Sequence, residues 1–263
     1  MKIIKCVFKW LGIAICLFLI FAFMQVPILE STPVYSIDSQ QQFIEAFKHV
    51  NMFHNIFMII IFTIITFIME WYVCKWLNNK LDFSKKLSRK NLILSLGAGV
   101  FCFILQLLTM FSVFVNAKPD VFTETLKTGL AVPLILSLTL IGPTLEELLF
   151  QAGIQKGIFK RLNPWIAIIL TAIIFAGAHN VTLNWSFLNR FLSGVAFGYV
   201  YQKTDDIKMA ILSHSISNLL PLIICCMQAW SWKINLNKFL QKIIDIQLPF
   251  PYTRICSVKE LVW

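Results

Sequence analysis

Charged side chains are scarce in this chain of 263 residues. Asp, Glu, Lys and Arg together make up 14% of the sequence, whereas 58% of the residues are hydrophobic. Soluble domains typically contain about a quarter charged and about half apolar residues. Together with a mean hydropathy of +0.74, this composition excludes an ordinary soluble domain. We therefore expect an all-α, multi-pass membrane protein in which one helical bundle spans nearly the whole length.

The sequence also lacks the signatures of several other classes. Its seven cysteines have neither the spacing of a disulfide framework nor that of a zinc site. No linker, repeat or low-complexity segment divides the chain, so we expect a single membrane domain over residues 1–263. The net charge of +10 falls in short runs between apolar segments, and a nucleic-acid partner is therefore not expected.

Long apolar runs predict seven transmembrane helices, because one span needs about 20 residues. We place them near residues 10–29, 52–76, 92–116, 129–154, 164–183, 187–202 and 209–230. The basic segments at the N-terminus, at 80–90 and at 156–161 alternate onto one side of the membrane, which the positive-inside rule predicts to be cytoplasmic. The N-terminus is therefore expected in the cytoplasm, with residues 10–29 as a retained signal-anchor helix.

Two segments fit this plan less well. Apolar residues recur at helical spacing between positions 43 and 50, which predicts a helix along the membrane interface. Residues 231–263 form an amphipathic tail or a poor eighth span, so the total is seven or eight transmembrane helices.

Two adjacent carboxylates, Glu146 and Glu147, lie inside the fourth apolar run. Pro143 predicts that a helix restarts or kinks just before them, and Thr144 has capping-box spacing to Glu147. Consecutive helical residues diverge by about 100°, so the two carboxylates are expected to face different surroundings. Glu147 and Gln151 are four residues apart and can hydrogen-bond, which predicts that Glu146 faces a reaction centre and that Glu147 is supported behind it.

Two later helices contribute imidazoles at membrane depth. His179 follows Phe175 by four residues, and Asn218 follows His214 by four, so each pair shares one helix face. An imidazole and a carboxamide on one face can donate to a developing oxyanion. Buried ionisable groups are costly in a bilayer, and three helices that each contain such groups predict one polar intramembrane cavity.

Other polar or small residues have simpler interpretations. His54 and Glu70, near the two ends of the second span, are expected at the membrane interface, and His49 lies in an outer loop. Gly194 and Gly198 have the spacing that lets two helices pack closely.

The motifs Glu146-Glu147-x-x-x-Gln151, Phe175-x-x-x-His179 and His214-x-x-x-Asn218, in this order on successive helices, resemble the CPBP family. This family comprises CAAX prenyl endopeptidase-like and bacteriocin-processing intramembrane proteases, also called the Abi family. The resemblance covers about residues 129–230, the expected catalytic core.

The resemblance implies hydrolysis of a peptide bond within the membrane of a bacterial cell. Glu146 and His179 would activate a water, and His214 and Asn218 would stabilise the oxyanion. The expected substrate is a lipidated or membrane-inserted peptide, such as a bacteriocin precursor, in contact with membrane lipid. A divalent metal such as zinc is one further option, with Glu146, His179 and His214 as candidate ligands.

One position departs from the family. Its first motif usually has Arg where this chain has Gln151, so Glu147 lacks the ionic partner that an Arg would offer. Two other functions therefore remain open. One is a non-catalytic immunity or peptide-binding protein that uses the same cavity. The other is a transporter with a proton relay, although the sequence has no inverted repeat.

Overall fold

Helices account for all the regular secondary structure of the residues that the structure describes. These are residues 2–34, 40–110 and 121–230 of a computed structural model. The elements are α1 (Lys2–Met24), α2 (Val26–Ser31), α3 (Gln40–Phe47), α4 (Met52–Trp76), α5 (Arg89–Met110), α6 (Val121–Thr125), α7 (Ala131–Leu136), η2 (Ser137–Ile141), α8 (Gly142–Glu147), η3 (Leu148–Ile158), α9 (Pro164–His179), α10 (Trp185–Thr204) and α11 (Ile207–Trp230). The prediction of an all-helical bundle is confirmed.

Among the described residues, four helical segments are long and apolar enough to cross a membrane: Phe8–Ser31, Met52–Trp76, Arg89–Leu108 and Ala131–Ile158. Pro164–His179 and Ile207–Ile223 are shorter apolar helices. The outer helices expose large apolar side chains, such as Phe18 (71% exposed) and Ile60 (53% exposed). Surfaces of this kind are unfavourable in water and favourable against lipid, and they fit a membrane protein.

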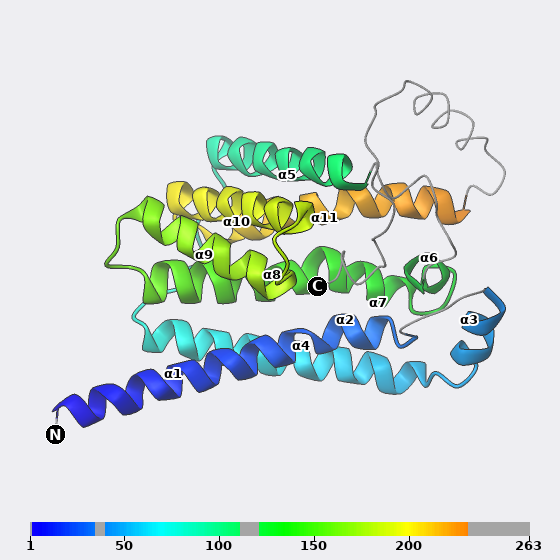
Figure 1. The fold of residues 1–263 in the computed structure, drawn as a ribbon, viewed down its shortest axis with the longest axis horizontal. Helices are drawn as coiled ribbons and strands as arrows, with labels where there is room; N and C mark the ends of the chain where they lie inside the picture. The colour runs from blue at the N-terminus through cyan, green and yellow to red at the C-terminus, as the bar shows by residue number, and fades with distance from the viewer. Residues whose placement is uncertain (1, 35–39, 111–120, 231–263) are drawn as a thin grey trace.

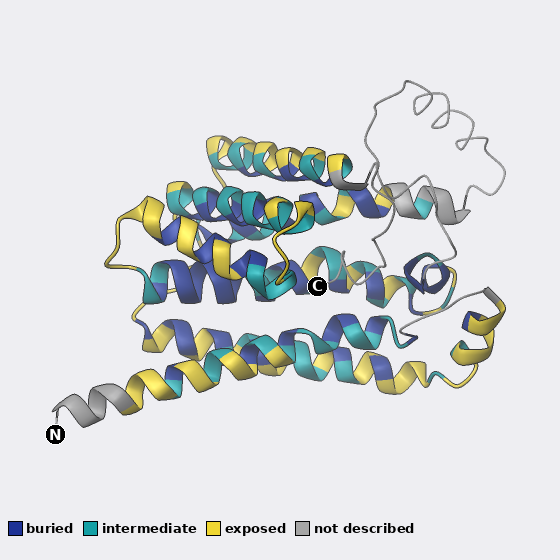
Figure 2. Ribbon diagram, viewed as in Figure 1, coloured by how far each residue is buried: buried dark blue, intermediate teal, exposed yellow. Residues whose placement is uncertain are grey.

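A single helical rod, residues 131–158, forms the centre of the bundle. Figure 1 shows α1, α2 and α4 along one side of this rod and α9, α10, α11 and α5 along the other. The half of the rod that contains η3 is mostly dark blue in Figure 2, and nine of the eleven residues of η3 are buried. A helical segment that is buried to this extent places its polar residues where water is excluded, which is the requirement for an enclosed active site.

A new α-helical segment, α8, begins at Gly142 with Pro143 in its first turn, as predicted, but the chain stays helical through this junction and the predicted capping box does not form. Instead, η2 and η3 are π-helical, with α8 between them. The Thr144 hydroxyl donates to the Leu140 carbonyl at 2.6 Å and does not cap the helix. In the π register of η2, Gly142 N–H donates to Ser137 O, and Pro143 has no N–H to donate to the next carbonyl, that of Leu138.

Close contacts at two glycines define how α10 packs. A Cβ at Gly194 would lie 3.1 Å from the Ala172 backbone and 3.2 Å from the Phe175 ring. A Cβ at Gly198 would lie 2.6 Å from Gln155 Oε1. The prediction that this glycine pair serves close packing is confirmed, and α10 therefore presses directly on α9 and on the central rod.

A polar cluster connects three elements at the predicted cytoplasmic end. Lys156 Nζ donates to Asp205 Oδ1 at 2.5 Å, and Lys85 Nζ donates to Asp205 Oδ2 at 2.8 Å and to its backbone carbonyl. Asp205 has a left-handed φ of 50°, a conformation that Asp tolerates better than most residues. This cluster joins the loop after α4, the end of η3 and the turn between α10 and α11.

Other predictions concern the edges of the bundle. The expected interfacial helix forms α3, whose Phe43 is buried against Val34 and Val121. Residues 111–116 of the third predicted span lie outside the described residues, and so does the tail 231–263. The extent of the single domain and the side of the membrane on which each end lies stay predictions.

Candidate active site

Three helices bring Glu146, His179 and His214 together beside the central rod. His179 Nε2 lies 3.5 Å from Glu146 Oε2, and His214 Nε2 lies 3.8 Å from the same oxygen. The three side chains are 14%, 11% and 3% exposed, respectively. One carboxylate oxygen thus faces two imidazole nitrogens in a nearly closed space.

The ring of His179 is oriented by its own helix. Its Nδ1 lies 2.8 Å from the Phe175 carbonyl oxygen, and because a carbonyl only accepts, Nδ1 carries the proton of this bond. Nε2 is therefore the nitrogen that faces Glu146. The Phe175 ring lies 4.4 Å from the His179 ring between centroids and is buried against Phe150 and Phe197, which restricts the imidazole further.

His214 is held by Glu147. Glu147 Oε1 lies 2.8 Å from His214 Nδ1, and the carboxylate is fully buried. His214 also stacks on Phe197 with 4.5 Å between ring centroids and 16° between ring planes. Glu147 and Phe197 fix the ring so that Nε2 points to Glu146, the arrangement in which a buried carboxylate orients a reactive histidine. Glu146 therefore faces Nε2 of His214, and Glu147 faces Nδ1 of the same ring.

Gln151 lies beside Glu147, as its spacing predicts, but the two side chains make no close hydrogen bond. Its side chain is fully buried, and neither polar atom has a hydrogen-bond partner among the described residues. Its oxygen would instead lie 3.1 Å from a Cβ at Gly198, so the amide packs against the backbone of α10. The close hydrogen-bond partner of Glu147 is therefore His214.

Asn218 is directed to the rod. Its amide nitrogen donates to the Leu138 carbonyl at 3.0 Å, the carbonyl that Pro143 cannot satisfy in the π register. The structure thus gives Asn218 a structural contact on the same face of α11 as His214. An amide nitrogen has two hydrogens, so this bond leaves one donor for a ligand.

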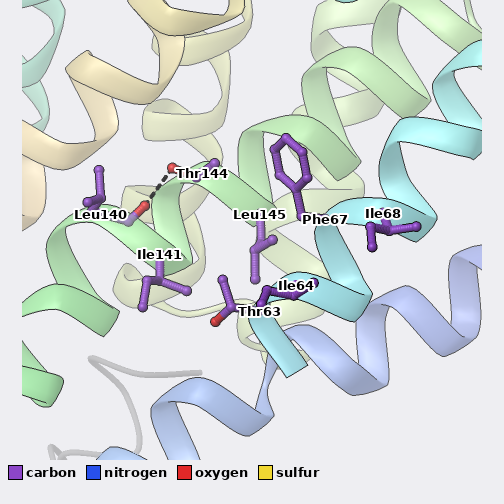
Figure 3. Close-up of a pocket in the computed structure, with 8 residues that line it drawn as sticks. All are labelled: Thr63, Ile64, Phe67, Ile68, Leu140, Ile141, Thr144 and Leu145. Carbon is purple, nitrogen blue, oxygen red and sulfur yellow. Dashed lines mark hydrogen bonds between the residues drawn. The ribbon is translucent and has the colours of Figure 1, made fainter. Parts of the chain in front are cut away.

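Two cavities adjoin these residues. The smaller has a volume of about 10 Å³ and is lined by Phe21, Met24, Gln25, Glu146, Phe150, Ala178 and His179. The larger, about 310 Å³, is an apolar groove between α4 and the rod, lined by Thr63, Ile64, Phe67, Ile68, Leu140, Ile141, Thr144 and Leu145 (Figure 3). Leu145 of the groove directly precedes Glu146, so the apolar groove and the polar site lie on adjoining parts of α8.

The donor set does not fit a metal site. Within the described residues, no group of three His, Cys, Asp or Glu side chains is arranged to bind one ion. This includes the candidate ligands Glu146, His179 and His214, and no metal enters the reaction described below.

Comparison with known families agrees with the position of this site. Residues 128–220 match the model of one family, described as type II CAAX prenyl endopeptidase Rce1-like. These residues form an Rce1-like domain. No curated protein and no solved structure matches the chain. The resemblance to the CPBP family is confirmed, and together with the apolar helices it supports a membrane protein with intramembrane endopeptidase activity.

The Rce1-like domain includes two contributors that the sequence motifs did not indicate. Phe197 orients His214, and Arg190, half-buried on α10, lies within electrostatic range of Glu146. Arg190 is a charge inside the sixth predicted span, which is the signal that would have found it.

Outside the Rce1-like domain, the structure corrects the interpretation of Glu70. This residue is 1% exposed and not interfacial, and its carboxylate has no hydrogen-bond partner among the described residues. It lies within electrostatic range of Glu146. His54, by contrast, is exposed at the start of α4.

Proposed function

We propose that this protein is an intramembrane endopeptidase in which Glu146 activates a water for attack on a peptide bond. The observation that supports this most directly is the buried Glu146 oxygen, which faces His179 Nε2 at 3.5 Å beside a cavity the size of a water molecule. This oxygen has no hydrogen-bond partner among the described residues. Two buried polar atoms that are 3.5 Å apart are too far for a strong direct hydrogen bond, and a water that bridges them is expected.

The reaction needs one proton acceptor and one oxyanion site. As the water oxygen bonds to the carbonyl carbon, its O–H bond breaks and the proton passes to the Glu146 carboxylate. The carbonyl oxygen takes the negative charge and is stabilised by the remaining N–H of Asn218 and by His214, which donates from Nε2 as an imidazolium while its Nδ1–H is bound by Glu147. When the C–N bond breaks, the proton moves from Glu146 to the leaving nitrogen, which restores the carboxylate.

The glutamine at position 151 does not argue strongly against this activity. The loss of the usual Arg at this position was expected to lower activity because Glu147 would lose its ionic partner. Glu147 instead pairs with His214 at 2.8 Å and needs no partner at 151. This contact favours the enzyme over a non-catalytic peptide-binding protein with the same cavity.

The substrate class follows from the surroundings of the site. The apolar groove beside Leu145 suits the lipid or apolar segment of a membrane-associated peptide, and the matched family suggests a prenylated CAAX sequence. A bacterial setting in which the enzyme processes bacteriocin-like peptides, or protects the cell from them, is consistent with this class.

The test separates catalysis from binding. Purified protein in liposomes is given a quenched-fluorescent peptide with a prenylated C-terminal CAAX sequence. Glu146→Gln keeps the size of the side chain and removes the base, so we expect cleavage to be lost while peptide binding persists. Leu140→Trp, at a groove residue that is 54% exposed, places a larger side chain in the groove and should weaken binding. If Glu146→Gln leaves function unchanged and only the groove substitution matters, the protein is a binding protein.

A further inference from the structure

The small cavity beside Glu146 has one wall that comes from outside the Rce1-like domain. Phe21, Met24 and Gln25, at the junction of α1 and α2, face Glu146 and His179 across it. Residues 128–220 are the matched domain, so this wall belongs to the N-terminal part of the chain. The N-terminal helices therefore enclose the reaction centre as well as surrounding the bundle.

The volume of the cavity fits a single water molecule. It is about 10 Å³, at the lower end of what one water needs. A buried water typically makes about three hydrogen bonds and needs at least two polar partners. Among the residues that line the cavity, Glu146, His179 and Gln25 have hydrogen-bonding side chains, and the others are apolar. The lining thus offers one water three polar partners.

The position of Gln25 in the chain is unusual for a polar side chain. It lies inside the apolar segment Phe8–Ser31, at the break between α1 and α2, and Pro27 follows within the first turn of α2. An amide at membrane depth that has no hydrogen-bond partner is unfavourable. Contact with a bound water compensates this cost.

We propose that Gln25 is a catalytic residue that orients the attacking water together with Glu146 and His179. This inference rests on the proposed function. The Gln25 amide nitrogen donates to the water oxygen, His179 Nε2 accepts one hydrogen of the water, and Glu146 Oε2 accepts the other and then takes that proton. The oxygen lone pair is thereby directed at the carbonyl carbon of the peptide.

The test compares a substitution in the wall of the cavity with one just outside it. Gln25→Met keeps the length of the side chain and removes the amide, whereas Val26→Ile changes only an apolar contact at the same helix junction and does not line the cavity. With the same prenylated peptide in liposomes, we expect Gln25→Met to lower kcat about 10- to 100-fold, the usual cost of a misplaced reactant. KM should stay within about twofold, and Val26→Ile should keep kcat within about threefold.

Three outcomes would overturn the inference. The first is an unchanged kcat for Gln25→Met when wild type is active and Glu146→Gln is inactive, a result that leaves the proposed function intact. The second is an equal loss in Gln25→Met and Val26→Ile, which would attribute the loss to disturbed packing at the junction of α1 and α2. The third outcome concerns a second variant, which is needed if Gln25→Met does not accumulate in the membrane. Gln25→Asn keeps the amide but shortens the side chain, so the amide no longer reaches the water. A normal kcat for Gln25→Asn would overturn the inference. Equal cleavage by wild type and Glu146→Gln would instead refute the proposed function itself.

Discussion

Replacing Gly99 by alanine tests how closely α5 approaches the helix of His214. A Cβ at Gly99 would lie 2.8 Å from the Ser213 carbonyl oxygen and 2.8 Å from Ile216 Cβ, and both atoms belong to α11. Separations under 3 Å force one helix to move, because the obstacle includes backbone. Overpacking of this kind costs about 1–3 kcal/mol.

Gly97 on the same helix provides a matched control. A Cβ there meets nothing within 4 Å. Alanine gains about 0.5–1 kcal/mol over glycine within a helix, and this gain is common to both variants, so it cancels in their difference. Gly99→Ala should therefore be less stable than Gly97→Ala by the overpacking cost alone, about 1–3 kcal/mol.

Thermal unfolding of the two variants in the same detergent measures this difference. For a chain of this size, about 1–3 kcal/mol corresponds to a gap in Tm of about 2–12 °C. Because Ser213 precedes His214, Gly99→Ala should also lower peptidase activity, and Gly97→Ala should not. If Gly99→Ala were as stable as Gly97→Ala, the described contact between α5 and α11 would be wrong.

Two further predictions concern polar contacts. Glu147→Gln replaces a charge-assisted bond to His214 by a neutral one, a loss of about 1–1.5 kcal/mol, and should lower kcat about tenfold with little change in KM in the liposome assay; an unchanged kcat would contradict the role of Glu147. At the other end of the bundle, burial raises the pKa of Asp205, but hydrogen bonds from Lys156 and Lys85 outweigh it and leave the pKa below its ordinary value. A lowered pKa in the folded state stabilises the protein above the unfolded pKa of about 3.9 and ceases to do so as the pH falls through the folded value. Because the Asp205 side chain is 71% exposed, Asp205→Asn should cost no more than about 1 kcal/mol at neutral pH. In thermal unfolding the gap to wild type should be constant between about pH 6 and 8 and should shrink below about pH 4; a gap that widens in acid would refute this sign.

The sequence predicted the helices and the pairs of residues that share a helix face, because both depend on local spacing. Phe175 with His179 and His214 with Asn218 are pairs of this kind. The contacts between helices depend on rotation and register, which local spacing does not specify. For this reason the partner of Glu147 was assigned to Gln151, four residues away, and not to His214, 67 residues away.

The contact of Asn218 was missed for a different physical reason. It depends on a π-helical segment, in which the carbonyl left without a donor by Pro143 belongs to Leu138 and not to the residue four positions earlier. Gln25 was overlooked because it is a single neutral polar residue in a long apolar run. Glu70 was assigned to the membrane interface because it lies near the predicted end of its span, and its 1% exposure shows that this position was a poor guide to burial.

Cleavage in water enriched with the heavy oxygen isotope tests the central claim most directly. If Glu146 activates a water, mass spectrometry of the products should find one heavy oxygen in the new carboxylate that wild type releases, and Glu146→Gln should release no product. Peptide that binds to wild type but stays intact, or cleavage that continues undiminished in Glu146→Gln, would contradict the account.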